Sequence, residues 1–362
     1  MKAHSHILRV CESFVGASDF RPLTSGKTKG LCSPKPEVRG PRPIFSQTFS
    51  PFVARGIAVL CAALFVATAC PAHAGINVWT SHGPPGGVGG LAIDPNTPRT
   101  LYVWGSGGFF KSTDAGATWS AANAGLPNNG VGGLAIDPIM PRTLYTAGFG
   151  GIFKSTDAGA NWAAVDFPGL PVFDPTTPTT LYAAAQGGVF KSTDAGATWG
   201  AANTGLTIYV NGLAIDPTTP GTLYAWTGGC DLGGGCSGGV FKSTDAGATW
   251  SATGLPSHFV SALAIDPNTP RTLYAATGRG YDSGGVFKST DGGDTWSVTG
   301  PNYVIALAID PMTPSTLYAA AQGGVFKSTD AGATWGAANS GLTSTYLQAL
   351  VIDPSTDRKS VG

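Results

Sequence analysis

Residues 188–199 read GVFKSTDAGATW, and residues 213–224 read LAIDPTTPGTLY. Close copies of these two phrases alternate from residue 91 onward, at a period of 37–50 residues. Such a period is typical of propeller blades, in which one small antiparallel sheet is repeated around a ring. The aspartates of the first phrase are Asp114, Asp157, Asp194, Asp245, Asp291 and Asp330, and those of the second are Asp94, Asp137, Asp174, Asp216, Asp266, Asp310 and Asp353.

Each phrase predicts a hairpin. In the second phrase Leu-Ala-Ile is a short apolar strand, Asp-Pro-x-Thr-Pro is turn chemistry, and Thr-Leu-Tyr begins the return strand. In the first phrase Val-Phe-Lys-Ser is a strand, Thr-Asp-x-Gly-x is a turn in which Gly supplies a positive φ, and Thr-Trp opens the next strand. We call the four strands of a repeat a, b, c and d, and expect the Trp to fill the wedge between neighbouring sheets.

The first phrase carries a family resemblance. Residues 112–119, STDAGATW, match the pattern S-x-D-x-G-x-T-W, and five further copies follow, with Asn161 replacing Thr in the second and DGGDTW closing the fifth from Asp291. Residues 76–356 therefore resemble the Asp-box (bacterial neuraminidase) repeat propellers, which include sialidases, xyloglucan hydrolases, sortilin-type receptors and photosystem II assembly factors. The resemblance implies a propeller in which the box is a structural turn away from any active site.

Strand counting predicts the number of blades. The sequence contains seven a strands and six each of b, c and d, and residues 76–79 (INVW) read as a seventh d strand. We therefore expect an all-β, seven-bladed propeller of four-stranded blades over residues 75–356, closed by the N-terminal d strand and incomplete in its last blade. Six blades are the alternative. Residues 357–362 leave the repeat pattern as an off-template tail, which resembles a truncated reading frame.

The N-terminal quarter predicts export. Residues 53–74 contain a basic residue, an apolar run from Ile57 to Ala69 and an A-x-A ending, which together read as a signal peptide cleaved after Ala74. We expect residues 1–52 to be an over-called or disordered extension, and the chain to be periplasmic, extracellular or on the cell surface. Lipidation at Cys70 is an alternative. In an oxidising compartment, Cys230 and Cys236 predict a local disulfide rather than a metal site.

Composition excludes several classes of protein. The formal net charge is zero and only 12% of residues are charged, which argues against nucleic-acid binding. After residue 74 the chain has no Glu, no cluster with metal-ligand spacing, no phosphate-binding loop and no nucleophile elbow. We therefore expect no metal, no cofactor, no stable membrane span and a monomer. Six lysines, one per box, are expected to lie on a solvated surface.

Loop lengths predict which face could bind a ligand. The a–b turn spans eight residues from Asp to Tyr in every repeat, and the c–d turn spans nine from Phe to Trp, whereas the b–c and d–a connections vary. The b–c connection is longest in the fourth and fifth repeats, at 17 and 13 residues from Tyr to Phe. Because variable loops on a rigid ring are where binding sites occur, we expect the b–c and d–a face of blades four and five to be functional. The candidate binding residues are Trp226, Asp231, His258, Phe259, Arg279, Tyr281 and Asp282.

Two functions are weighed against each other, and a surface-attached recognition module within a larger assembly is a third possibility. The first is a non-catalytic binding or assembly scaffold whose partner is a glycan, peptide or protein. The second is a glycoside hydrolase that uses Asp231 and Asp282 as its two carboxylates. A sialidase-like site is nearly excluded, because it needs a Glu partner and three convergent arginines, whereas Arg99, Arg142 and Arg271 all fall in a–b turns. The absence of Glu and the aromatic character of the variable loops favour binding over acid–base catalysis.

Overall fold

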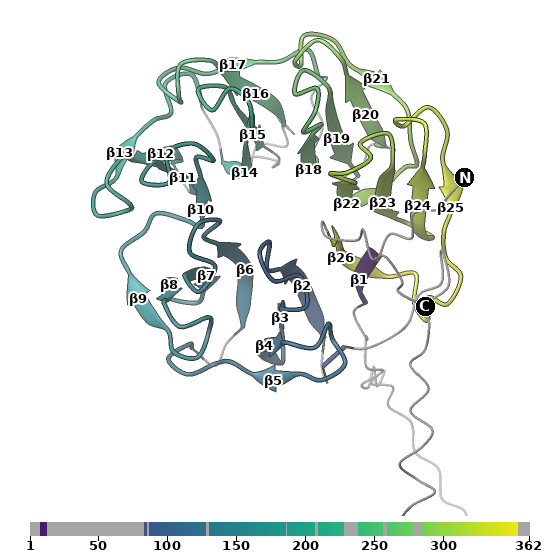
Figure 1. The fold of residues 1–362 in the computed structure, drawn as a ribbon. Coiled ribbons are helices and arrows are strands. Elements are labelled where there is room, and N and C mark those ends of the chain that lie inside the picture. The colour runs from purple at the N-terminus through teal and green to yellow at the C-terminus, as the bar shows by residue number, and fades with distance from the viewer. Residues whose placement is uncertain are drawn as a thin grey trace, which may run out of the picture. The chain divides into compact units, whose positions relative to one another are not determined.

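The chain is built of short antiparallel strands arranged in a ring (Figure 1). The computed structural model describes residues 8–12, 83–84, 87–127, 130–185, 187–206, 209–227, 238–255, 259–278 and 284–353, with 8–12 described by their backbone only. No helix occurs in these ranges. Six sheets have four strands each, ordered a-b-c-d as in the sequence, which is the arrangement of a β-propeller.

The six blades follow one another along the chain with the following bounds. Blade one has β2 (Val88–Ile93), β3 (Leu101–Gly105), β4 (Gly108–Ser112) and β5 (Ser120–Ala121); blade two has β6 (Val131–Ile136), β7 (Leu144–Gly148), β8 (Gly151–Ser155) and β9 (Ala163–Val165). Blade three has β10 (Pro171–Phe173), β11 (Leu181–Ala185), β12 (Gly188–Ser192) and β13 (Gly200–Ala201); blade four has β14 (Val210–Ile215), β15 (Leu223–Thr227), β16 (Gly239–Ser243) and β17 (Ser251–Ala252). Blade five has β18 (Val260–Ile265), β19 (Leu273–Thr277), β20 (Val286–Ser289) and β21 (Ser297–Val298); blade six has β22 (Val304–Ile309), β23 (Leu317–Ala321), β24 (Gly324–Ser328) and β25 (Gly336–Ala337).

Aspartate side chains hold the a–b turns, as the sequence predicted. Asp94 Oδ1 accepts hydrogen bonds from the backbone N–H groups of Asn96 and Thr97, at 2.9 and 3.0 Å. Asp266 makes the same pair of bonds at 2.9 and 3.1 Å. These carboxylates are buried, and each satisfies two backbone donors that the tight turn leaves without a strand partner.

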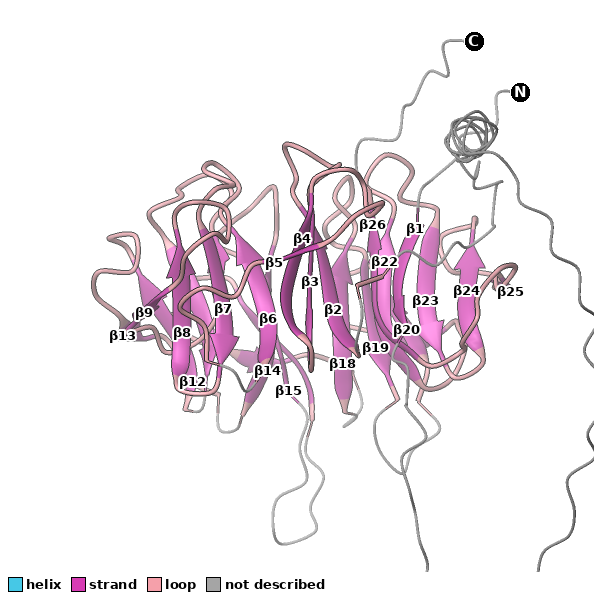
Figure 2. Cartoon of the chain, turned by 90° about the horizontal axis from the view of Figure 1, so that it is seen from below, coloured by secondary structure: helices cyan, strands magenta, loops and turns pink. Residues whose placement is uncertain are grey.

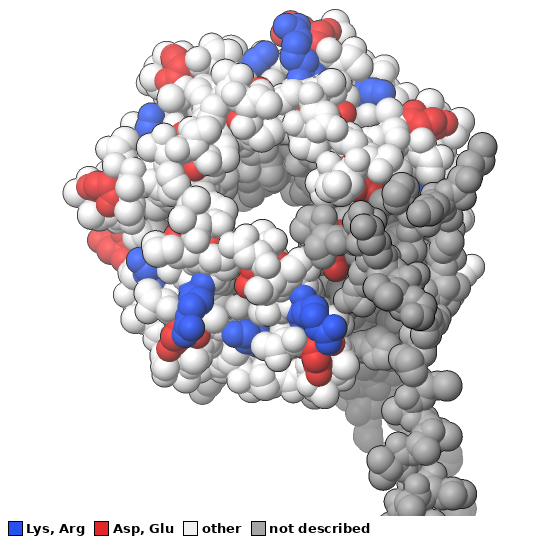
Figure 3. Space-filling model, in the orientation of Figure 1, with Lys and Arg blue, Asp and Glu red and all other residues white. Residues whose placement is uncertain are grey.

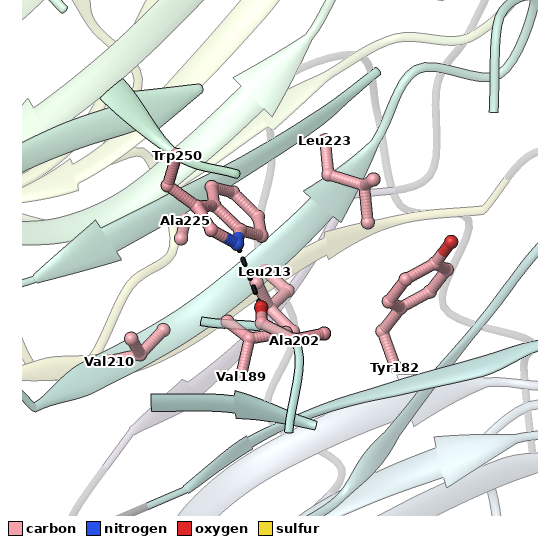
Figure 4. Packing of buried hydrophobic residues seen from close by; sticks show 8 residues of the cluster. All are labelled: Tyr182, Val189, Ala202, Val210, Leu213, Leu223, Ala225 and Trp250. Atoms are coloured by element: carbon pink, nitrogen blue, oxygen red, sulfur yellow. Dashed lines mark hydrogen bonds between the residues drawn. The ribbon is translucent and has the colours of Figure 1, made fainter. Parts of the chain in front are cut away.

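The hydrophobic core lies between the blades. The cluster drawn in Figure 4 combines Tyr182 and Val189 of blade three with Leu213, Leu223 and Trp250 of blade four. The indole Nε1 of Trp250 donates a hydrogen bond of 2.8 Å to the carbonyl of Ala202, which follows the d strand of blade three. The box Trp therefore fills the wedge between two sheets, as predicted, and it also ties the two sheets together.

The expected seventh blade is not present as a four-stranded sheet, so the main prediction of seven blades is corrected to the alternative of six. The seventh a strand, β26 (Leu347–Ile352), contacts β22 of blade six and β2 of blade one. It pairs with β1 (Leu8–Glu12) in a two-stranded sheet. Within the described residues, the strand beside β26 is β1 and not a local b strand. Residues 76–79, expected to supply the closing d strand, lie outside the described residues.

Candidate functional site

The two faces of the ring differ in their connections. In blade three the backbone N–H of Ala195, in the box, donates a 2.8 Å hydrogen bond to the carbonyl of Thr179, in the a–b turn. All six blades have this bond between the box turn and the a–b turn. The a–b and c–d turns therefore lie on one face, the box face, and the b–c and d–a connections lie on the other, the loop face. Figure 2 shows the ring from the side, with connections at both ends of the strands.

Each Asp box is a closed network of short hydrogen bonds. In the third box, Asp194 Oδ1 accepts from the Ser192 hydroxyl at 2.7 Å and from the backbone N–H of Thr198 at 2.9 Å. Asp194 Oδ2 accepts from the Thr198 hydroxyl at 2.6 Å, and Ser192 Oγ accepts from the N–H of Gly196 at 2.8 Å. These bonds stabilise the ionised form, so the pKa of Asp194 falls to about 2, with the Thr198 hydroxyl as the largest cause. The lowered pKa is therefore a property of a turn and does not indicate a catalytic acid.

The box turn contains a left-handed alanine that the sequence analysis did not anticipate. Gly196 has φ 88°, as predicted for the turn, but the preceding Ala195 also has a positive φ of 58°. The fifth box has Gly292 at the position of Ala195, with φ 78°. A Cβ atom in this region costs about 1–2 kcal/mol, so five of the six boxes keep an alanine in a strained conformation.

Four of the six repeated lysines bridge neighbouring blades and all six are half-buried, which corrects the expectation of a solvated surface. Lys242 of blade four donates a 2.9 Å hydrogen bond to the carbonyl of Gly292 in the box of blade five. Its Nζ also lies 5.8 Å from the ring centroid of Tyr224, and all six lysines lie over the corresponding Tyr at 5.2–5.8 Å. Burial raises the pKa of Tyr224 to about 12. Most of the charge on the box face is therefore structural, and Figure 3 shows acidic and basic groups side by side around the ring.

The loop face carries a row of aromatic side chains at one register position. The residue directly before the innermost strand is aromatic at four successive positions of the ring: Tyr209 before β14, Phe259 before β18, Tyr303 before β22 and Tyr346 before β26. Tyr209 is 56% exposed, Tyr303 39% and Tyr346 69%, and Phe259 is half-buried. We call these four residues the aromatic row. The sequence places all four among the aromatic residues of the variable connections, and Phe259 was one of the predicted binding residues. Their shared offset from each a strand could also be read from the sequence.

Tyr303 holds an unfavourable backbone conformation. Its φ is 55°, in the left-handed region that bulky residues rarely adopt. The same register position in blade two is Gly130, which has φ 84° and no Cβ to strain. Glycine would adopt this backbone conformation without strain, so the tyrosine side chain does not stabilise the fold here. Strained backbone of this kind is typical of functional sites.

Trp226 has a packing role. It lies on β15 with its register partner Gly212 on β14, and a Cβ added to Gly212 would lie 2.2 Å from Trp226 Cζ2. Trp104 covers Gly90 in blade one in the same way, with a corresponding distance of 2.1 Å. Both indoles are half-buried. Trp226 thus lies across Gly212 of the inner strand and is half-buried there.

The remaining predicted residues lie in the long loops. Asp231, His258, Arg279, Tyr281 and Asp282 all fall outside the described residues, so their predicted roles stay predictions. The same holds for the disulfide between Cys230 and Cys236.

The described part of the loop face offers little acid–base chemistry. Asp166 is its one carboxylate with a described side chain, since the other aspartates of these ranges lie in a–b turns or boxes, Asp294 included. Within the described ranges no group of three His, Cys, Asp or Glu residues could hold a metal ion. No helix long and apolar enough to cross a membrane was found in the same ranges.

Comparison with known proteins establishes the fold. No family model matches the chain, and no curated protein matches it in sequence. Among solved structures, a GH74 xyloglucanase from Xanthomonas campestris is similar with a TM-score of 0.59 and 22% identity, over 70% of this chain and 47% of that one. YCF48 from Cyanidioschyzon merolae has a TM-score of 0.52 and 16% identity, over 71% of this chain and 87% of that one.

The extracellular domain of a putative one-component system from B. thetaiotaomicron is similar as well, with a TM-score of 0.55 and 15% identity, over 72% of this chain and 35% of that one. The chain thus spans about half the length of the xyloglucanase and most of the length of YCF48. At these sequence identities, the structural similarity shows a shared fold and does not show a shared activity. The structural neighbours, together with six Asp boxes in register, are consistent with the Asp-box repeat propeller superfamily.

Proposed function

We propose that the chain is an exported, non-catalytic binding or assembly scaffold whose ligand, a glycan, peptide or protein, contacts the loop face. The observation that carries the proposal is the aromatic row, three of whose four members are well exposed although large apolar side chains are normally buried. Exposed aromatic rings suit the apolar faces of sugars and peptides, and the described part of the loop face has Asp166 as its one carboxylate. The strained backbone of Tyr303 supports the same face.

The test compares exposed apolar residues on the two faces. Tyr209→Ala and Tyr346→Ala on the loop face are matched with Ile139→Ala and Met312→Ala, which are 61% and 71% exposed on the box face. A glycan array and a peptide array, read with purified protein, first supply a ligand. Affinity should then fall at least tenfold in the loop-face variants and stay within twofold in the box-face variants. Equal losses on both faces would contradict the proposal.

Tyr303 allows a sharper test, because folding and binding should respond in opposite directions. Tyr303→Gly relieves a left-handed tyrosine, so the free energy of unfolding should stay the same or rise by about 0.5–1 kcal/mol. Ligand affinity should fall. A variant that is destabilised and binds normally would show that the ring serves folding.

A glycoside hydrolase is the second candidate, favoured by the structural likeness to GH74 xyloglucanases. It would use Asp231 and Asp282, which the sequence places in neighbouring b–c loops. A screen on polysaccharides tests it: turnover abolished by Asp231→Asn or Asp282→Asn would establish the hydrolase and overturn the scaffold. Ligand binding without turnover supports the scaffold.

Export and the disulfide belong to the same proposal. The secreted protein should begin at Gly75, and an N-terminus upstream of residue 53 would refute export. Mass spectrometry of the secreted protein should find Cys230 joined to Cys236, and two free thiols would refute the disulfide.

A further inference from the structure

The partner strand of β26 comes from the far end of the chain. In the six blades, the a strand is followed by an aspartate turn and its own b strand. After β26, Asp353 is the last described residue, and the adjacent strand is β1 (Leu8–Glu12). The position of a b strand is therefore filled by a segment that is not connected through a hairpin.

The pairing of β1 with β26 reproduces the register of a repeat. Ile352 is opposite Leu8 and Leu350 is opposite Val10, with an irregularity beside Leu347. In blade one, β2 and β3 pair as Ile93 with Leu101 and Leu91 with Val103, with a shift beside Val88. The sequences agree as well: β1 reads LRVCE and β3 reads LYVWG, with Leu and Val at equivalent places. Residues 8–12 thus take the place of a b strand.

β26 itself is held by the neighbouring blades. Leu347 and Leu350 are 1% and 6% exposed and join the core cluster that contains Tyr318 of blade six. Ala349 and Val351 pack against the cluster of blade one. Side chains from both neighbouring blades therefore hold β26 in position, in addition to its pairing with β1.

The connection to β1 is much longer than a hairpin turn. A b strand follows its a strand after about eight residues, whereas some 75 residues separate β1 from β2 in the sequence. No tight turn therefore fixes β1 beside β26, as the aspartate turn fixes each b strand beside its a strand. A strand that no tight turn fixes can exchange with another of the same pattern.

We propose that β26 is a strand-acceptor site: it binds an extended apolar segment, donated by another polypeptide, that adds antiparallel with Leu opposite Ile352 and a β-branched or small residue opposite Leu350. Leu8–Glu12 is the occupant supplied by this chain. The mode of binding is β-strand addition, in which backbone bonds give affinity and alternate side chains give specificity. The inference goes beyond the proposed function and does not depend on export, although cleavage after Ala74 would remove the internal occupant.

The experiment uses the full-length chain with Val10→Pro and Cys11→Pro. The N–H groups of consecutive strand residues point to opposite sides, so one of the two prolines removes a bond to β26 in any case. Val38→Pro with Arg39→Pro, in the segment between β1 and β2, is the matched control. Hydrogen–deuterium exchange of Leu347–Ile352 should be at least tenfold faster in the first variant and unchanged in the control.

A synthetic peptide of residues 6–14 then tests whether β26 binds a strand from a separate molecule. In excess it should restore slow exchange at β26 in the Val10→Pro, Cys11→Pro protein, and the peptide with the same two prolines should not. The proposal is wrong if the prolines leave exchange at β26 unchanged, or if the unmodified peptide has no effect. Exchange of Leu181–Ala185 in blade three should stay slow throughout; if it accelerates together with β26, β1 is an integral strand of the ring and not an exchangeable one.

Discussion

Replacing Gly212 with alanine would place a methyl carbon 2.2 Å from Cζ2 of Trp226. Carbon atoms are in favourable contact at about 3.5–4.0 Å, so the indole would have to move by more than 1 Å. Overpacking of this kind costs about 1–3 kcal/mol. Trp226→Ala should cost roughly 2 kcal/mol, below the 3–5 kcal/mol of a fully buried tryptophan because the ring is half-buried.

The double variant Gly212→Ala, Trp226→Ala should be no less stable than Trp226→Ala alone. Blade five already has this pair, Ala262 opposite Ala276, at the same register position. The assay is urea unfolding followed by circular dichroism, and the expected result is a coupling free energy of at least 1 kcal/mol in favour of the double variant. If the two single effects add, or if Gly212→Ala is as stable as the wild type, the packing argument is wrong. The double variant is also the proper background in which to ask whether Trp226 touches a ligand.

Three further predictions concern the box face. Ala195→Gly should raise the free energy of unfolding by about 0.5–1 kcal/mol by relieving the left-handed alanine, and the reverse change Gly292→Ala should lower it by a similar amount; thermal unfolding that shows no difference in sign between the two would contradict the assignment. The pKa of Asp194 is about 2 in the folded chain and about 4 in the unfolded chain, so its contribution to stability is present above pH 4 and lost as the pH falls to 2. Between these pH values, the free energy of unfolding of Asp194→Asn should therefore change less than that of the wild type. Urea titrations at each pH measure the difference. Lys242→Met keeps the aliphatic stem and loses the hydrogen bond from the ammonium group to the carbonyl of Gly292. The free energy of unfolding should therefore fall by about 1–2 kcal/mol at low and high salt alike. A loss that disappears in 1 M salt would mean that the lysine acts only as a surface charge.

The hairpins could be predicted from the sequence because their causes are local. Asp94, its following Pro and the return Leu-Tyr define a turn within nine residues, and the Ser, Asp, Gly and Thr of a box define another. The positions that were missed depend on residues far apart in the chain. Lys242 meets a carbonyl of the next blade, 50 residues away, and Leu8 pairs with Ile352. No local propensity predicts either contact.

The loop face could be identified from spacing, whereas the exposed residues on it could be identified only in part. Constant a–b and c–d offsets placed those turns together, and the bond from Ala195 to Thr179 confirms that they share a face. Trp226 was selected as an aromatic residue near a long loop, but the sequence does not reveal that Gly212 lies beneath its ring. Tyr303 was recognisable as an aromatic residue of a variable loop, whereas its left-handed backbone became visible only in three dimensions.

The position of the core between the blades has a consequence for how such a chain can change in length. Each core cluster combines side chains of one repeat with side chains of the next. A repeat duplicated within the gene therefore carries both of the surfaces that pack against its neighbours. Boxes one, three, four and six read STDAGATW without a difference, which is what recent copying or recombination between repeats would leave behind. The junction of blades two and three is distinct, because Phe167 is stacked 5.3 Å from Tyr145 and packs edge-on against Trp199. Exchanging a repeat beside that junction would remove these ring contacts.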